Sequence, residues 1–200
     1  MVTREDKRNL QYIKFYKPYG VLCDFADDEG RRTLKEFFPF SELQVAGRLG
    51  LDSEGLVFLT NDGWVNHRIT SPNFHLPKTY LVLVEGKALV PALQQLRRGT
   101  IIKHGYKTLA CEAEVILQPD LPEREKPITV KRVTTWLKII LREGKKRQVR
   151  QMTAAVGLPT LRLVRVRIGP ISIEELKPGE WRLLDEQEVG ILMDELKAQE

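Results

Sequence analysis

Gly47-Arg48-Leu49-Gly50-Leu51-Asp52-Ser53-Glu54-Gly55-Leu56 is the stretch that says most about the fold of this chain. Apolar runs flank it, and their composition predicts one strand over residues 43–49 and another over residues 56–60. The glycines and polar residues between these runs are typical of a loop. We therefore expect two strands joined by a loop.

Outward from this loop, strands and isolated helices alternate irregularly. We expect strands at 12–16, 21–23, 78–85, 109–117, 135–141, 160–168 and 181–184, and helices at 33–38, from 61–63 to about 71, 89–98, 145–156 and from 185. A turn at 17–20 and a proline-rich connection at 119–127 punctuate the pattern. This alternation favours an α+β fold with a mixed, largely antiparallel sheet and flanking helices over a doubly wound one.

The bulk composition is that of a globular protein of one domain. The chain has 200 residues, of which 42% are hydrophobic and 30% charged. We expect a disordered N-terminus at 1–10 and a single domain with two lobes at 11–200. No apolar run approaches the ~20 residues of a membrane span, and the charged start leads into no signal core, so we expect a cytoplasmic protein. Cys23 and Cys111 lie in apolar surroundings and three histidines are scattered, so we expect neither a disulfide nor a metal site.

Basic residues are concentrated in less than one fifth of the chain. The overall charge is +5, yet residues 131–167 hold eleven Lys or Arg and a single acid, Glu143. In the helix expected at 145–156, Lys146, Arg147 and Arg150 share a side away from the apolar stripe, and in the next strand Arg165 and Arg167 share a face. This pattern predicts a surface for the phosphates of a nucleic acid; an ordinary solvated surface is the alternative.

The central loop resembles the signature of the RNA pseudouridine synthases of the RsuA type. That signature is Arg-Leu-Asp, two residues, Ser or Thr, one residue, Gly-Leu, and Arg48, Leu49, Ser53, Gly55 and Leu56 match it. Two further segments are similar to the family's other motifs: Lys78-Thr79-Tyr80, and the stretch from Glu143-Gly144 through 147–150 to Leu163 and Gly169. The resemblance spans nearly the whole chain and is closest to a large-subunit synthase; since the catalytic part begins at once, we expect no separate S4-type RNA-binding domain.

The resemblance implies a pseudouridine synthase fold with a central RNA-binding cleft. It implies that Tyr80 stacks on the target base, that Arg150 pairs with the catalytic carboxylate, and that Leu163 packs beside the uracil. It assigns contacts with RNA to Arg48, Lys78, Lys145, Lys146, Arg147, Arg165 and Arg167. It implies ribosomal RNA of the large subunit as the partner. Since the reaction that the resemblance implies conserves the number of bonds, we expect no cofactor and no metal, and we expect a monomer.

Position 50 departs from the family's pattern. The catalytic aspartate is expected there, and this chain has Gly50. We therefore predict an inactive or impaired synthase; the alternative is a noncatalytic RNA-binding module or ribosome-assembly factor with the same fold. A natural loss of activity, a single substitution and a loop re-registered around Asp52 all remain open. Asp52 is expected ~6–7 Å along an extended chain from position 50, too far to replace the missing acid.

Overall fold

A computed structural model gives the structure of the chain and describes residues 10–38 and 42–199. Its elements are β1 Tyr12–Lys17, η2 Leu34–Glu36, β2 Gln44–Ala46, β3 Glu54–Thr60, α1 Gly63–Thr70, η3 Pro72–Phe74, β4 Lys78–Glu85, α2 Val90–Arg98, η4 Lys103–Gly105, β5 Glu112–Ile116, β6 Thr134–Leu141, α3 Gln148–Ala155, β7 Thr160–Ile168, β8 Ile171–Ser172, β9 Trp181–Leu183 and α4 Glu186–Lys197. Apart from Leu10, the N-terminal segment predicted to be disordered lies outside the described residues.

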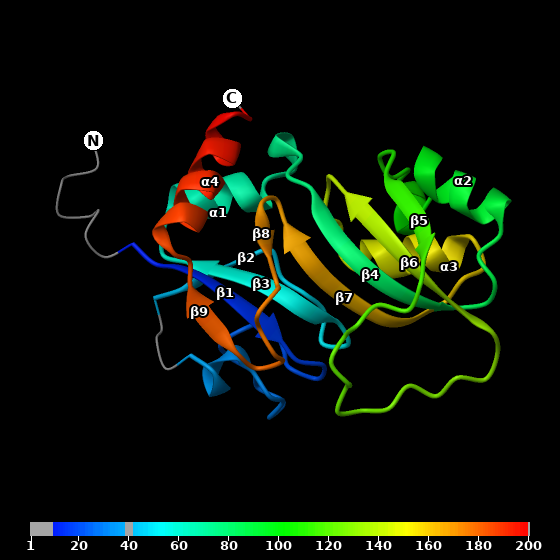
Figure 1. Cartoon of the computed structure of the whole chain (residues 1–200), viewed down its shortest axis with the longest axis horizontal. Coiled ribbons are helices and arrows are strands. Elements are labelled where there is room, and N and C mark those ends of the chain that lie inside the picture. The colour runs from blue at the N-terminus through cyan, green and yellow to red at the C-terminus, as the bar shows by residue number, and fades with distance from the viewer. Residues whose placement is uncertain (1–9, 39–41, 200) are drawn as a thin grey trace.

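The strands form one continuous sheet, which Figure 1 shows face-on. Its order is β5-β6-β4-β7-β3-β1-β9, with β2 paired to β3 and β8 paired to β7. Among the described residues, the β3–β7 pair is parallel and the other strand pairs are antiparallel. The predicted α+β class with a mixed, largely antiparallel sheet is therefore confirmed.

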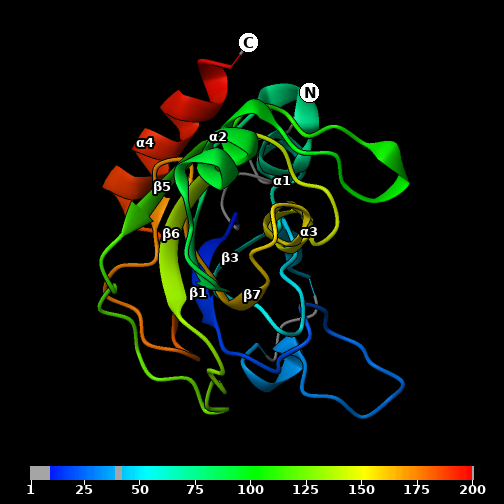
Figure 2. The same ribbon diagram turned by 90° about the vertical axis from the view of Figure 1, so that its right-hand side faces the viewer.

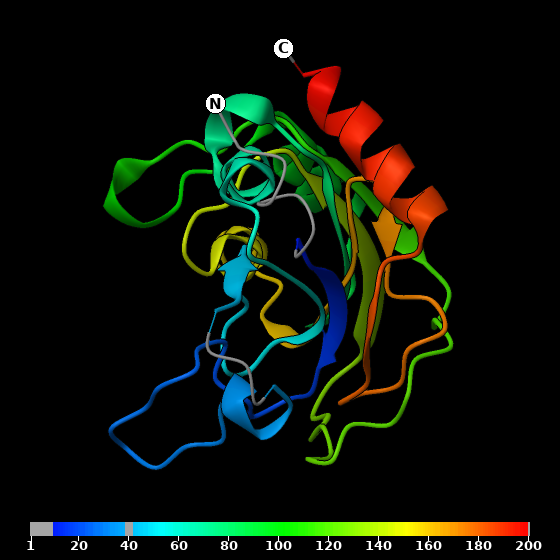
Figure 3. The same cartoon turned by 90° about the vertical axis from the view of Figure 1, so that its left-hand side faces the viewer.

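Side chains alternate between two apolar layers, one on each face of the sheet. Along β3, Val57 and Leu59 join the layer that contains residues of α2 and α3, whereas Leu56 and Phe58 join the layer that contains residues of α1 and α4. Figures 2 and 3 show α3 and α4 on opposite sides of the sheet. Hence the basic helix predicted from the sequence covers one face, and the acidic C-terminal helix covers the other.

The parallel contact between β3 and β7 requires glycine at position 55. Gly55 pairs with Arg165, and its φ of +106° lies in the region that L side chains rarely adopt. A Cβ at this position would lie 2.2 Å from the carbonyl oxygen of Arg165. The glycine of the signature loop is thus a packing requirement, because the backbones of β3 and β7 approach too closely for a side chain at position 55.

Several element ends differ from the sequence predictions for local reasons. The strand predicted at 43–49 ends at Ala46, because Gly47 adopts a φ of +87° and turns the chain into the loop. The strand predicted at 21–23 is wrong; Leu22 makes an isolated bridge to Thr33. The strand predicted at 109–117 begins only at Glu112, and β8 was not predicted.

The start of the basic helix also differs from its prediction. The helix begins at Gln148 instead of residue 145, because Arg147 has a φ of +56°. Lys145 and Lys146 therefore lie in a loop before the helix and not on its first turn.

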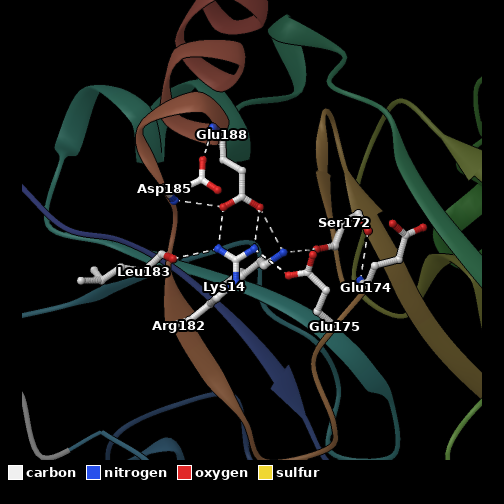
Figure 4. Close-up of polar contacts among 8 residues, drawn as sticks. All are labelled: Lys14, Ser172, Glu174, Glu175, Arg182, Leu183, Asp185 and Glu188. Carbon is white, nitrogen blue, oxygen red and sulfur yellow. Dashed lines mark hydrogen bonds and ion pairs between the residues drawn. The ribbon is translucent and has the colours of Figure 1, made fainter.

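The C-terminal helix is attached to the sheet by an ion-pair network (Figure 4). Glu188 lies 3.1 Å from Nζ of the buried Lys14 in β1 and accepts hydrogen bonds from Arg182 in β9 at 2.6 and 3.0 Å. The same carboxylate accepts from the backbone N–H of Asp185, whose own side chain caps the helix. One glutamate thus closes the helix cap and joins it to two strands.

We predict that Gly55→Ala destabilises the protein by about 3 kcal/mol or more, through overpacking against Arg165 and through backbone strain. Gly63→Ala is the matched control, because a Cβ there meets no atom within 4 Å. Urea unfolding measures both variants. Equal stability of Gly55→Ala and the control would contradict the close approach of β3 and β7.

We also predict a pH-dependent contribution from Glu188. Hydrogen bonds from Arg182 are the main cause that lowers the pKa of Glu188 from 4.5 to about 2, against the effect of burial. Since the folded-state pKa is the lower one, the stabilisation is complete above about pH 5 and is lost as the pH falls towards 2. Glu188→Gln should cost about 1–2 kcal/mol at pH 7 after allowance for solvent screening, and progressively less at pH 4 and 2.5.

Urea unfolding at these three pH values tests the expectation, with Glu186→Gln on the exposed side of the same helix as the control. A cost for Glu188→Gln that stays constant from pH 7 to 2.5 would rule out the ionic contribution.

Candidate functional site

A cavity of about 650 Å³ opens on the face of the sheet that α3 covers. The signature loop forms one wall, the start of β4 forms the floor, and the segment between β6 and α3 forms the opposite wall. Its lining residues are Gly47, Arg48, Leu49, Gly50, Leu51, Thr70, Ser71, Pro72, Lys78, Tyr80, Arg142, Glu143, Gly144, Lys145, Lys146, Arg147 and Arg165. Segments far apart in the sequence thus enclose a basic cleft.

A smaller recess of about 80 Å³ shares this wall and brings the four predicted catalytic positions together. Gly50, Tyr80, Arg150 and Leu163 all line it. Tyr80 and Leu163 are buried on the same face of neighbouring strands, and Arg150 comes from the first turn of α3. The sequence prediction that these residues share one site therefore matches their positions; their roles remain predictions.

The tip of the signature loop is a turn held by two arginines. The N–H of Ser53 donates to the carbonyl of Gly50 at 3.0 Å, which folds residues 50–53 back on themselves. Arg147 donates to both carboxylate oxygens of Asp52, at 2.7 and 2.8 Å, and Arg150 donates to the Asp52 carbonyl at 2.6 Å. Burial opposes ionisation of Asp52, but Arg147 and Arg150 outweigh it and hold the pKa of this carboxyl below its ordinary value.

The extended chain assumed between position 50 and Asp52 is wrong, because residues 50–53 form a turn. The turn places Oδ1 of Asp52 3.1 Å from where a Cβ on residue 50 would lie, and Nη1 of Arg147 3.4 Å from the same point. The φ of Gly50 is outside the left-handed region, so a side chain fits the backbone there. A side chain at position 50 would therefore lie next to the carboxylate of Asp52, which Arg147 already binds.

Arg150 is incompletely satisfied in this arrangement. Its Nε is buried and has no hydrogen-bond partner among the described residues; the nearest carboxylate oxygen, Oδ2 of Asp52, lies 3.4 Å away. Burial is the main cause that lowers the pKa of Arg150, and the charge of Asp52 partly offsets it. A buried donor without an acceptor is costly, so the site favours a further acidic oxygen near Arg150.

Arg165 does not belong to an exposed phosphate-binding face, contrary to the sequence prediction. Its side chain is buried, with the residue 2% exposed, and donates to the carbonyls of Leu56 at 2.8 Å and Gly47 at 2.6 Å. These two carbonyls lie at the two ends of the signature loop. Because β7 lies beside β3, the guanidinium points into the fold and clamps the loop, although it also reaches the floor of the cavity.

The other residues predicted to contact RNA differ in their exposure and in whether they line the cavity. Arg48, Lys145, Lys146 and Arg147 line the cavity on partly or fully exposed side chains. Lys78 lines it as a buried residue, and burial, with a smaller effect of Arg165, lowers its pKa to about 8. Arg167 is exposed but is not among the residues that line either pocket.

Glu143 is a buried acid of the cleft whose hydrogen bonds the sequence did not predict. This carboxylate is 5% exposed and accepts hydrogen bonds from Tyr106 at 2.6 Å, the N–H of Leu109 at 2.7 Å and Gln148 at 2.6 Å. It joins α3 to the loop before β5. Its being the only acid in a basic segment was the available signal.

The described residues show no cluster of three or more His, Cys, Asp or Glu side chains that could hold a metal ion. Cys23 and Cys111 are free thiols, the first buried and the second partly so. No helix within residues 10–38 or 42–199 combines the length and apolar character needed to cross a bilayer.

The sequence and the fold of this chain are similar to those of known proteins. The family model for RNA pseudouridylate synthase matches residues 11–155. Ribosomal large subunit pseudouridine synthase E of Vibrio vulnificus is 49% identical over 172 residues, covering 85% of this chain and 73% of the relative. The protein of the same name from Xanthomonas campestris pv. campestris is 46% identical over 177 residues, covering 86% and 95%. A crystal structure of a pseudouridylate synthase superposes with a TM-score of 0.77 at 31% identity, covering 92% of this chain and 74% of that one.

We predict that the two neighbouring arginines of β7 respond differently to substitution. Arg165→Met should cost about 3 kcal/mol, because it removes two hydrogen bonds from a charged donor to buried carbonyls. Arg167→Met, on the exposed side, should change stability by no more than about 0.5 kcal/mol. Urea unfolding and amide hydrogen exchange over residues 47–56 measure the effect. Unchanged exchange in this loop in Arg165→Met would show that Arg165 does not hold it.

Proposed function

This chain belongs to the RNA pseudouridylate synthase family, and from that premise we propose that its cleft binds a uridine of large-subunit ribosomal RNA. The observation that carries the proposal is the recess shared by Gly50, Tyr80, Arg150 and Leu163. The relatives named above, which act on the large ribosomal subunit by their names, support the choice of RNA.

The reaction exchanges two bonds within one nucleotide. The N1–C1′ bond of uridine breaks, the base turns, a C5–C1′ bond forms, the C5 proton leaves and N1 takes up a proton. A base stacked in a helix is out of reach of such a site, so the target uridine must be extruded into the recess. In this proposal Tyr80 stacks on the extruded base, Leu163 packs against it, and the cations Arg48, Lys145, Lys146 and Arg147 hold the neighbouring phosphates.

The step that this chain lacks is the one that needs a carboxylate on residue 50. An anion beside C1′ starts the isomerisation, and a charged, oriented arginine keeps that anion ionised. Here Asp52 occupies Arg147, and Nε of Arg150 has no hydrogen-bond partner within the described chain. We infer that the protein binds RNA and isomerises it poorly or not at all.

A noncatalytic RNA-binding module is the second candidate, and the glycine at position 50 favours it. In this case the cleft recognises ribosomal RNA during ribosome assembly and the chemistry has been lost. The two candidates agree on RNA binding and differ in turnover. Action as a monomer in the cytoplasm, without cofactor or metal, stays a prediction under both.

We predict that Gly50→Asp raises activity by more than about a thousandfold, because it supplies the missing anion at a position whose backbone accepts a side chain. The measurement is tritium release from C5-labelled uridine in a large-subunit RNA transcript. Gly50→Asn is the matched control, with the same shape and no negative charge. RNA affinity, measured in parallel, should change little between the original chain and Gly50→Asp.

Asp52→Asn in the original chain tests the remaining alternative. Tritium release by the Gly50 protein that disappears in Asp52→Asn would show that Asp52 is the working acid and would contradict the role given to position 50. RNA binding without tritium release in any variant would favour the noncatalytic candidate.

A further inference from the structure

A second cavity, of about 450 Å³, lies on the other side of the basic segment 145–147. One wall comes from the loop at 102–106, and the other from residues 145–147 and Gln151. Lys145, Lys146 and Arg147 line both this cavity and the cleft described above. Figures 2 and 3 show the loop around residue 104, in green, projecting on the same side of the sheet as α3.

The walls of this second cavity are held in place by specific hydrogen bonds. The side chain of Gln151 accepts from the N–H of Lys103 at 3.0 Å and donates to the carbonyl of Lys146 at 2.7 Å, which ties one wall to the other. The loop is closed by a bond from the N–H of Ile102 to the carbonyl of Tyr106 at 2.8 Å. A polar bridge of this kind favours a cavity that keeps its shape before a ligand arrives.

Tyr106 connects this cavity to the cleft. Its hydroxyl donates to Glu143 at 2.6 Å, and Glu143 itself lines the cleft. The ammonium of Lys145 lies 4.7 Å from the centroid of the Tyr106 ring. The second cavity therefore presents an aromatic ring and the apolar Ile102 beside four cations, and none of the described residues that line it is acidic.

This combination matches one repeating unit of single-stranded RNA. An aromatic ring accepts any base by stacking, and cations accept the phosphate. Because three of these cations face both cavities, a phosphate bound at segment 145–147 can join a nucleotide on one side to a nucleotide on the other. A volume of about 450 Å³ is in the range of small-molecule sites.

We propose that the second cavity binds the nucleotide adjacent to the target uridine, with its base against Tyr106 and Ile102 and the linking phosphate at Lys145–Arg147. This inference rests on the proposed function, since it requires RNA in the cleft. In this proposal the loop at 102–106 holds the RNA strand on one side of the extruded base.

The test uses single-stranded RNA of nine nucleotides with a central uridine and one abasic site at each flanking position in turn. Fluorescence anisotropy measures the affinity of the full chain and of Tyr106→Ala, Tyr106→Phe and Lys103→Glu. For the unsubstituted chain, one abasic position next to the uridine should weaken binding about tenfold, and the more distant positions should matter less. For Tyr106→Ala, an abasic site at that position of the RNA should not weaken binding further. Tyr106→Phe keeps the ring, so the abasic site should weaken its binding as it does for the original chain.

Lys103→Glu should weaken binding of the intact RNA, and Lys87→Glu, at the far end of β4, should not. Should an abasic site weaken binding equally in the unsubstituted chain and in Tyr106→Ala, or at no flanking position, the second cavity is not a nucleotide site, while the proposed function stands. A chain that binds none of these RNAs at any salt concentration would overturn both proposals. Since Lys103 is exposed, its variant keeps the test valid even where Tyr106→Ala unfolds.

Discussion

The parallel contact between β3 and β7 is the constraint on which the rest of the structure depends. Gly55 allows the two backbones to meet, and Arg165 then reaches across to bind the carbonyls at both ends of the signature loop. The contact brings residues 47–56 beside residues 145–165, which are about a hundred positions away in the chain. Without it, the loop, the recess and the basic segment would not form one site.

The arginines of the basic region have different structural roles although they lie close together in the sequence. Arg162 and Arg165 are buried: the first pairs with Glu54 at 2.7 Å and the second holds the signature loop. Arg147 and Arg150 hold the loop tip through Asp52, and the exposed Lys145 and Lys146 remain for phosphate. Because Arg162 and Arg165 are buried and bound by other groups of the fold, they are not available to a ligand.

Asp52 and Glu143 show how two acids organise a basic cleft. Asp52 pairs with the two arginines beside position 50, Arg147 and Arg150. Glu143 accepts hydrogen bonds from Tyr106 and Gln148, and in this way it connects the cleft to the second cavity. Removal of either acid would leave buried or partly buried donors unsatisfied, which is why we expect both to matter for the shape of the site as well as for its charge.

The linear sequence determined the class of fold, most elements and the four positions of the recess, because periodicity, turn residues and the three motifs are local signals. Tyr80, Arg150 and Leu163 could be named from their motifs together with Gly50. What only the tertiary structure decided is the direction in which each side chain points: Arg165 turns inward since β7 lies beside β3, Asp52 approaches position 50 since the loop tip folds into a turn, and Glu143 is buried beneath Tyr106. Alternation along a strand predicts which face a residue shares, but whether that face meets solvent or another backbone depends on contacts between distant segments.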